Sequence, residues 1–397
     1  MKCDGLILLL QHIHRYGIAT FVSFFFMNLE QLSILNYKNI AEARLAFSPN
    51  VNCFIGDNGM GKTNILDAIY YLSFCKSNSQ LPDQMAMRHD TDVMMIQGRY
   101  RNSVGEEDVI TCGLKRGQRK HFKRNDKEYK RLSEHLGLIP LVMISPADSE
   151  LITGGSEERR RFLDIVISQT NLPYLEALIR YGKSLQQRNA LLKQEDEPDW
   201  GLCEVLEMMM AEDAEVIYAT RAAMVEAYRP IFQELYGRLC NNTHEEVSLS
   251  LESHGERGNL LPILQTWRER ERIVGHTLHG PHKDNLELTL NGYNIRKEGS
   301  QGQTKTYFIA MKLAQFLYLK TCGRCQTPIL LLDDIFDKLD SGRVARIVDY
   351  VSGNDFGQIF ITDTNREHLD SILQQTLRDY RLFNVSHGNI TESPHKH

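Results

Sequence analysis

The stretch Gly56-Asp57-Asn58-Gly59-Met60-Gly61-Lys62-Thr63 decides the fold, because it matches the Gly-x-x-x-x-Gly-Lys-Thr phosphate-binding loop at every required position. In such a loop several backbone N–H groups converge on one polyphosphate, so the closest approaches need residues without side chains. Its three glycines meet this need. We expect Lys62 to reach the phosphates as a positive charge and the Thr63 hydroxyl to hold Mg²⁺ beside them.

The residues around the loop have the order that this motif requires. The apolar run from Val51 to Ile55 predicts a strand that enters the loop, and Asn64 to Ile69 predict the helix that leaves it. A chance glycine-rich turn would not need this order, and a helix start adds the positive end of its dipole toward an anion. The loop residues predicted to bind a nucleotide are Gly56, Asn58, Gly59, Gly61, Lys62, Thr63 and Asn64.

A second stretch supplies the acidic strand that such a loop needs beside it. The continuous apolar run from Pro328 to Leu332 predicts a buried parallel strand, and Asp333 and Asp334 stand at its carboxyl end, where ligands bind in open α/β sheets. We expect Asp333 to hold Mg²⁺, directly or through water, and Asp334 to orient or activate an attacking water. The alternative is a core strand that ends in two solvated carboxylates. The predicted catalytic residues are Lys62, Asp333 and Asp334, and the predicted Mg²⁺ ligands are Thr63 and Asp333.

The two halves of this site lie far apart in the chain, which implies a large insertion between Lys62 and Asp333. Upstream of the acidic strand, Gly299 to Gln303 lead into an apolar helical segment from Thr306 to Leu319. A serine and a glycine at a helix start offer exposed N–H groups and the positive dipole end to a phosphate. An ordinary capped helix start would have a similar sequence.

A basic segment extends from Lys115 to Arg131 and reverses the sign of the local charge. It holds nine basic and two acidic residues, whereas the whole chain has a net charge of −5. Such a strip could neutralise several DNA phosphates. The alternative is a solvated hairpin whose lysines protect an edge strand from pairing. The predicted DNA-binding residues are Lys115, Arg116, Arg119, Lys120, Lys123 and Arg124, with Arg159 to Arg161 as a second choice.

The remaining patterns predict short strands on either side of a long helical region. From about Glu157 to Arg238 most residues favour helix, with one polar break at Asp196 to Gly201, so an antiparallel helical arm is expected. The predicted β segments are a hairpin from Met27 to Phe47, then Val93 to Gln97, Asp108 to Leu114, Ile139 to Ile144, 246–252 and 285–296.

Length and composition describe an ordinary soluble protein. The 397 residues suffice for roughly two or three domains, and 42% are apolar. Neither apolar patch before Met27 reaches the ~18 residues of a membrane span, so no membrane is predicted and residues 1–26 are interpreted as an upstream extension. The eight scattered cysteines favour reduced thiols in a cytoplasm.

Two small clusters resemble metal ligands only superficially. Cys322 and Cys325 form one close pair without a second pair to complete four zinc ligands, so ordinary thiols are the better interpretation. His276, His279 and His282 are three apart, but Gly280-Pro281 prevents one helical face, which favours loop histidines with local partners.

The combined motifs resemble the ABC-type ATPase head and, within that class, the RecF family of bacterial DNA repair proteins. Order and spacing both match along nearly the whole chain after Met27. The resemblance rests on Leu32 to Asn39, Gly56 to Asn64, Ser145-Pro146 with Asp148, Arg159 to Asp164, Gln187 to Asn189, Leu191 to Lys193, Gly280 to Leu286, Ser300 to Lys305 and Leu330 to Asp340.

The resemblance implies an α/β fold: an ABC-type ATPase head with a mixed sheet and an inserted α-helical arm. The implied domains are a discontinuous head at 27–160 and 270–397, with the arm at 161–269. It also implies an ATP-dependent homodimer. In this dimer the signature residues Ser300, Gly302 and Gln303 of one subunit close over the nucleotide that Lys62 and Thr63 of the other subunit hold. The nucleotide contacts added by the family pattern are Lys38, Ser300, Gly302, Gln303 and Asp340, the last at the dimer seam, and Gln358 to Thr364 form the strand and switch after the acidic strand.

The implied role is recombinational repair and replication restart. A member of the family is a weak DNA-dependent ATPase that uses ATP and Mg²⁺, recognises gapped duplex or junction DNA, and helps RecO and RecR to load RecA. Two departures stand out: Asp334 replaces the glutamate usual among ABC ATPases, which is consistent with slow turnover, and Lys283 stands where the family more often has arginine. A transporter subunit would not explain the basic segment, and a chromosome-organising protein needs a far longer coiled coil.

Overall fold

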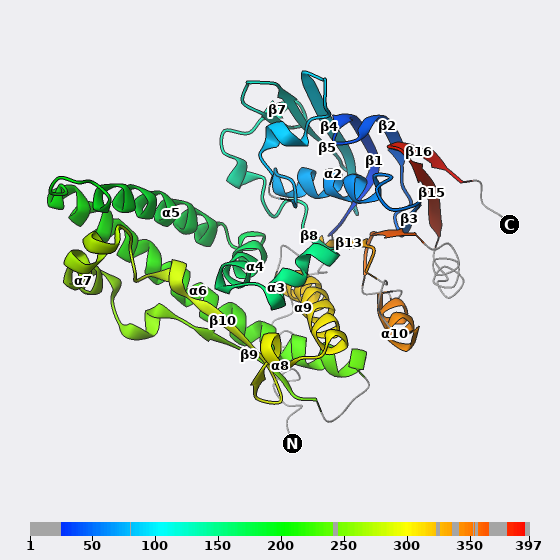
Figure 1. Cartoon of the computed structure of the whole chain (residues 1–397). Helices are drawn as coiled ribbons and strands as arrows, with labels where there is room; N and C mark the ends of the chain where they lie inside the picture. The colour runs from blue at the N-terminus through cyan, green and yellow to red at the C-terminus, as the bar shows by residue number, and fades with distance from the viewer. Residues whose placement is uncertain are drawn as a thin grey trace, which may run out of the picture.

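The computed structural model describes residues 25–79, 81–240, 245–322, 326–335, 341–351, 353, 356–364 and 379–393, and its strands form three sheets (Figure 1). The strands are β1 (Phe25–Tyr37), β2 (Ile40–Ala46), β3 (Val51–Ile55), β4 (Val93–Asn102), β5 (Glu107–Lys115), β6 (His121–Arg124), β7 (Lys127–Glu128), β8 (Leu141–Ile144), β9 (Val247–Glu252), β10 (Asn285–Leu290), β11 (Tyr293–Asn294), β12 (Gln326–Thr327), β13 (Ile329–Asp333), β14 (Ile359–Asp363), β15 (Tyr380–Ser386) and β16 (Asn389–Glu392).

Helices connect and cover these sheets. The α-helices are α2 (Lys62–Phe74), α3 (Glu150–Thr153), α4 (Ser156–Ser168), α5 (Leu172–Leu192), α6 (Trp200–Cys240), α7 (Leu260–Val274), α8 (Ile295–Glu298), α9 (Gln301–Cys322) and α10 (Ser341–Val351). Short 3₁₀ turns are η1 (Asp83–Ala86), η2 (Leu132–Glu134), η3 (Pro146–Ser149), η4 (His254–Arg257) and η5 (Pro281–Lys283).

A six-stranded sheet with the order β16-β15-β3-β14-β13-β8 forms the centre of the head. All neighbours from β15 to β8 are parallel, and the four strands β3, β14, β13 and β8 are largely apolar and buried on both faces. Along β13, Leu331 packs into the same hydrophobic cluster as α2, whereas Leu330 and Leu332 pack with α9. The sheet is therefore sandwiched between helices, and its carboxyl edge carries the phosphate loop and Asp333 on one side of the molecule.

A seven-stranded sheet lies on the other side of α2. The β1–β2 hairpin and the meander β4-β5-β6-β7 are antiparallel, and β12 joins β1 in parallel. One buried side chain links this sheet to the central one, because Gln358 accepts from the Leu29 N–H and donates to the carbonyls of Leu29 and Ser48. The predicted hairpin and the two predicted strands after it are confirmed, and β1 begins at Phe25, two residues before the expected start.

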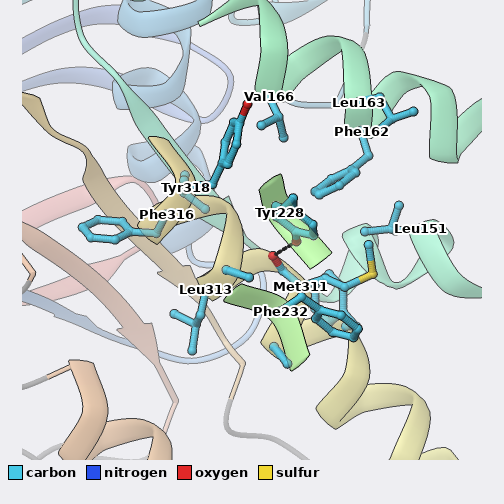
Figure 2. Close-up of a cluster of buried hydrophobic side chains, with 14 of the residues drawn as sticks. Leu151, Phe162, Leu163, Val166, Tyr228, Phe232, Met311, Leu313, Phe316 and Tyr318 are labelled. Atoms are coloured by element: carbon cyan, nitrogen blue, oxygen red, sulfur yellow. Dashed lines mark hydrogen bonds between the residues drawn. The ribbon is translucent and has the colours of Figure 1, made fainter. Parts of the chain in front are cut away.

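The helical arm projects from the head as the pair α5 and α6, with α7 beside its outer end (Figure 1). The long helix α6 returns from the arm into the head, where its C-terminal half packs on α9. There Tyr228 donates a hydrogen bond to the Met311 carbonyl, and Figure 2 shows Tyr228 and Phe232 among side chains from α3, α4 and α9. Because the same helix belongs to both parts, the arm and α9 share one hydrophobic core.

A buried ionic cluster fixes the outer part of the arm. Arg188 on α5, Glu207 on α6 and Glu271 on α7 are each 0% exposed, and the guanidinium lies 2.9 Å from Glu207 and 2.7 Å from Glu271. Arg188 also donates to Thr277, and the partly exposed Arg268 forms a second ion pair with Glu207. The side chain of Arg188 therefore connects the three helices α5, α6 and α7.

Three details refine the sequence-based expectations. The acidic strand β13 is separated from the loop strand β3 by β14. The predicted β segment 285–296 ends at Asn294, where Asn294 caps the short helix α8. The helical segment predicted from Thr306 to Leu319 begins at Gln301, so the serine and the glycine stand at a helix start, as predicted. Strand order depends on partners distant in sequence and a cap depends on a single polar residue, and neither is specified by period-2 and period-3.6 patterns.

Several predictions fall on residues outside those described: Asp340, Cys325 and residues 1–24 of the proposed extension. The domain limits remain a prediction. Among the described residues, no helix combines the length and the apolar composition needed to cross a bilayer.

Candidate nucleotide-binding site

The phosphate loop forms a hollow at the carboxyl edge of the central sheet. β3 ends at Ile55, and α2 begins at Lys62 after Gly61 at φ 110°, so the first turn of the helix faces the hollow. Its volume is about 150 Å³. The residues that line it are Asp57, Asn58, Gly59, Gly61, Lys62, Thr63, Asn64, Asp333 and Asp334.

The loop glycines serve different needs. A Cβ on Gly56 would lie 2.2 Å from the Val385 carbonyl oxygen, so β15 leaves no room for a side chain there. A Cβ on Gly61 would lie 2.6 Å from the Asn39 side chain, whereas Gly59 faces open space and is needed for its φ of +79°. Close packing behind the loop and an open face in front of it suit a backbone that binds phosphate.

Lys62 is held inside the loop. Its ammonium group donates to the carbonyls of Gly56 at 2.5 Å and Asp57 at 3.1 Å, and the residue is only 6% exposed. A buried cation bound to carbonyls alone has no counterion among these contacts, so an anion in the hollow would complete its electrostatic environment.

Thr63 and Asp333 bring the two halves of the sequence motif together. The Thr63 hydroxyl donates to Asp333 Oδ1 at 3.0 Å, and Thr362 on the intervening strand β14 donates to the same oxygen at 2.7 Å. Burial raises the pKa of Asp333, and these two hydrogen bonds oppose the rise. Thr362 was predicted only as part of the strand and switch, and it fixes the carboxylate from the second side.

Asp334 begins the turn after β13 in a left-handed conformation, at φ 48°. Its N–H donates to the Thr362 carbonyl and hydroxyl at 3.3 and 3.1 Å, and the residue lines the hollow. Asparagine and aspartate tolerate this conformation better than larger residues. The turn therefore presents a second carboxylate next to Asp333 with its own backbone held by β14.

Asn39 supports the loop from the β1–β2 turn, and the sequence motifs did not identify it. Its side chain donates to the Met60 carbonyl at 3.2 Å and accepts from Asn64 at 2.7 Å. Its neighbour Lys38 forms an ion pair with Asp67 on α2 at 2.6 Å and does not line the hollow, and its contact with a nucleotide stays a prediction. The hairpin turn is thus joined to α2 at two points.

The predicted signature residues lie apart from this hollow in the same chain. Ser300 and Gln303 form a reciprocal capping box at the start of α9, with Gln303 Oε1 accepting from the Ser300 N–H at 2.9 Å and the Gln303 N–H donating to Ser300 Oγ at 3.3 Å. Ser300 is exposed, and none of Ser300, Gly302 and Gln303 lines the hollow. The phosphate loop and the predicted signature residues are therefore separate within this chain.

The basic segment forms the outer hairpin β6–β7, and its cations divide into two groups. Lys120 forms an ion pair with Asp83 at 2.8 Å and donates to the Cys75 carbonyl. Arg124 donates two hydrogen bonds, of 2.7 and 2.8 Å, to the carboxylate of Asp108. Arg116 binds the Thr91 carbonyl. The side chains of the other three predicted DNA-binding residues make no hydrogen bond or ion pair to any described residue; Lys115 and Arg119 are exposed, and Lys123 is half-buried.

The second predicted basic group, Arg159 to Arg161, is largely committed to internal contacts. Arg159 donates to the Asn285 side chain at 3.0 Å, and Arg160 to the Asp284 carbonyl at 2.8 Å. Asp284 in turn accepts from the buried Arg221, 2% exposed, which also binds Asp164. The segment from Gly280 to Leu286, which had no assigned role, thus joins α4, α6 and β10.

The three spaced histidines have local partners, as the loop interpretation predicted: His276 contacts the Val274 carbonyl, and His279 Nδ1 accepts from Arg257. His282 Nε2 donates to the Thr277 carbonyl at 3.1 Å, which leaves Nδ1 to accept from the Tyr181 hydroxyl at 2.7 Å. Burial lowers the pKa of His282 to about 4. Among the described residues, no group of three or more His, Cys, Asp or Glu side chains is placed to hold a metal ion.

The donor set at the hollow fits a nucleotide with Mg²⁺. A hydroxyl and a carboxylate 3.0 Å apart are two oxygen ligands of the kind Mg²⁺ takes, and this ion normally completes its octahedron with waters and substrate phosphates. Lys62, the N–H groups of the loop and the start of α2 supply positive charge opposite them. The residues therefore suit a triphosphate more than a metal held by protein alone.

The fold and the site define a class: an ABC-type ATPase head with an inserted helical arm. Residues 28–388 match the family model described as the RecF/RecN/SMC N terminal domain. The chain is 56% identical to the DNA replication and repair protein RecF of Phocaeicola vulgatus and 54% identical to that of Bacteroides thetaiotaomicron; each match covers 92% of this chain, and 98% and 99% of those proteins. The chain therefore belongs to the RecF family of DNA replication and repair proteins.

Solved structures agree with this assignment. The recombination mediator protein RecF with ATP, of the RecFOR pathway, superposes with a TM-score of 0.83 at 27% identity, over 94% of this chain and 99% of that one. The Smc head domain of Pyrococcus furiosus superposes with a TM-score of 0.56 at 16% identity, over 92% of this chain and 96% of that one, which shows a shared fold.

Proposed function

We propose that this chain is an ATP-gated, DNA-binding homodimer of recombinational repair and replication restart. Lys62, Thr63 and the loop N–H groups bind the triphosphate, and Ser300, Gly302 and Gln303 of the second subunit close over it. The observation that carries the proposal is the separation of the two halves: Thr63 and Asp333 are in contact, whereas none of the signature residues lines their hollow.

The chain's own residues supply the chemistry of slow ATP hydrolysis. Asp333 and Thr63 hold Mg²⁺, which neutralises charge on the phosphates when bound. Lys62 moves from its two carbonyls to the phosphates, and Asp334 orients a water and accepts its proton. An aspartate is shorter than a glutamate by one methylene, so a longer path to the water favours slow turnover. Asp340 at the seam remains part of this proposal by family pattern alone.

The energetic basis of the gate is differential affinity. A nucleotide bound between two subunits favours the dimer only by as much as it binds the dimer more tightly than the monomer. DNA that contacts both subunits favours the dimer in the same way. ATP hydrolysis removes the contribution of the nucleotide, so the dimer dissociates and releases the DNA.

We place the DNA on the outer hairpin and assign the direct contacts to the exposed part of the basic segment, Lys115 and Arg119 with Lys123. Lys120, Arg124 and Arg116 instead shape that surface through their internal partners. The substrates are gapped duplex and junction DNA, the partners are RecR and RecO, the outcome is RecA loading, and the location is the cytoplasm. Relatives named for replication and repair, and a related structure of the RecFOR pathway, support this role.

The test is binding of the purified chain to gapped duplex DNA with and without ATP and Mg²⁺, with molecular mass followed in the same samples. Lys62→Met should lose both ATP-driven dimerisation and ATP-stimulated DNA binding. DNA binding that is unaffected by ATP and by this substitution would contradict the proposal.

A further inference from the structure

One carboxylate connects the arm helix to the signature segment. Glu245 Oε1 accepts a hydrogen bond from Gln303 Nε2 at 2.8 Å, and its Oε2 accepts one from the Tyr236 hydroxyl at 2.6 Å. Gln303 lies in the first turn of α9, and Tyr236 lies near the end of α6. The motif analysis did not point to Glu245, which is 58 residues from Gln303 in sequence.

This contact determines which way the Gln303 amide faces. An ionised carboxylate only accepts hydrogen bonds, so the amide NH₂ group must face Glu245. The amide oxygen then faces the Ser300 N–H, which donates to it at 2.9 Å. Without Glu245 the amide could rotate by 180° and lose the bond to Ser300. The orientation of two signature residues therefore depends on a third residue outside the signature.

The surrounding charges keep Glu245 ionised. Burial alone would raise its pKa, but hydrogen bonds from Gln303 and Tyr236 and the positive charge of Arg343 lower it overall. Arg343 lies on α10 and reaches the signature as well, since a Cβ on Gly302 would lie 2.7 Å from its Nη1. The carboxylate thus remains an acceptor at neutral pH.

The other side of Glu245 is rigid. Tyr236 is 1% exposed, and its ring lies 5.8 Å from that of Tyr307 on α9, which in turn lies 4.8 Å from Phe232. The Tyr307 hydroxyl also donates to the Ser248 carbonyl of β9. Glu245 is therefore held between a packed tyrosine of the arm helix and the exposed start of α9.

We propose that Glu245 is a positioning residue for the composite ATP site: it holds Gln303 and Ser300 in the orientation in which they close over the nucleotide of the second subunit. This inference rests on the proposed function. Because the partner of Glu245 is the end of α6, the same contact joins the position of the arm to the closure of the site.

The test compares three variants of the full chain with wild type. Glu245→Ala removes both hydrogen bonds, Glu245→Gln keeps an oxygen for Gln303, and Tyr236→Phe removes one bond while preserving the packed ring. The readouts are the urea midpoint, ATP binding to the monomer, the ATP-dependent dimer dissociation constant and the turnover number. A matched control is Glu246→Ala, which removes the neighbouring exposed carboxylate.

We expect Glu245→Ala to weaken ATP-dependent dimerisation and lower turnover by about tenfold or more, with monomer ATP binding unchanged. Glu245→Gln should restore most of the loss, Tyr236→Phe should be intermediate, and Glu246→Ala should match wild type. The inference is overturned if the Glu245→Ala protein dimerises as well as wild type. It is also overturned if this variant is less stable than wild type and its monomer binds ATP correspondingly more weakly.

Mixing experiments separate this inference from the function on which it rests. If Glu245 acts across the seam, Lys62→Met and Glu245→Ala complement each other: a mixed dimer pairs an intact loop with an intact signature, so turnover exceeds that of either variant alone. If Glu245 acts on the loop of its own subunit, the mixture gains nothing and the inference fails. If wild type itself does not dimerise with ATP, the proposed function fails first.

Discussion

The Thr63 hydroxyl donates a hydrogen bond of 3.0 Å to Asp333 across 270 residues of sequence, and Thr362 donates to the same carboxylate oxygen from the strand between them. One oxygen of Asp333 is thereby fixed from both sides before any ligand arrives. Such preorganisation lowers the cost of ordering a metal ligand at the moment of binding.

Replacing Asp333 tests its assignment as a metal ligand. We expect Asp333→Asn to lower Mg²⁺-dependent ATP turnover by about 100-fold or more, because a metal contributes several kcal/mol to charge stabilisation in the transition state. Thr362→Val leaves the charge and removes only the hydrogen bond at 2.7 Å, so it should cost about tenfold or less. Single-turnover rates against Mg²⁺ concentration measure both. Equal losses in the two variants would contradict a metal-binding role specific to Asp333.

The two groups of cations in the hairpin predict a matched pair of phenotypes. Arg119 is exposed, so Arg119→Ala should leave the free energy of unfolding unchanged and reduce the salt slope of DNA binding by about 0.9. Lys120 binds Asp83 and the Cys75 carbonyl, so Lys120→Ala should cost about 1–3 kcal/mol of stability and leave that slope unchanged. Urea unfolding and salt titrations of DNA binding distinguish them. If Lys120→Ala instead lowered the salt slope and Arg119→Ala lowered the stability, the paired Lys120 would carry the DNA contact.

The ionic cluster of the arm predicts a large effect on stability. Arg188→Ala leaves two carboxylates, Glu207 and Glu271, that are each 0% exposed, and should lower the free energy of unfolding by about 3–5 kcal/mol. Arg238→Ala removes an exposed helical pair with Glu234 and should cost about 0.5 kcal/mol or less. Urea midpoints measure the difference. Equal midpoints in the two variants would exclude a structural role for the buried cluster.

Local sequence patterns predicted the parts of the site that local chemistry defines. The phosphate loop from Gly56 to Thr63 requires small residues and a lysine at fixed spacing. The strand before Asp333 is buried on both faces and therefore requires a continuous apolar run. Both patterns can be recognised in a single sequence. The prediction of a site shared between two subunits rests on the family resemblance, because the signature alone has the same pattern as a capped helix. The structure has that cap, since Ser300 and Gln303 bind each other reciprocally.

The parts that were not predicted depend on contacts between distant segments. β14 lies between β3 and β13 because of strand order, which hydrophobic periodicity does not encode. Lys38 pairs with Asp67, and Arg188 with Glu207 and Glu271, through tertiary contacts without sequence signals of their own. Asn39 had the nearest signal, a polar residue in the turn of a predicted hairpin. A charge count along 115–131 likewise could not separate exposed cations from paired ones.

The buried histidine next to the hairpin predicts how stability depends on pH. His135 is 0% exposed; its Nε2 donates to the Leu72 carbonyl, so Nδ1 accepts from the Tyr129 hydroxyl, and burial lowers its pKa to about 4. The unfolded chain takes up this proton near pH 6.5 and the folded chain only near pH 4, so the free energy of unfolding falls as pH decreases through that window. The loss due to His135 should be roughly 3 kcal/mol.

In His135→Gln, an amide can replace both hydrogen bonds without titrating, so the variant should lose less stability than wild type between pH 6.5 and 4. Urea unfolding at half-unit pH steps measures the difference, and parallel curves for the two proteins would show that His135 does not cause the acid sensitivity.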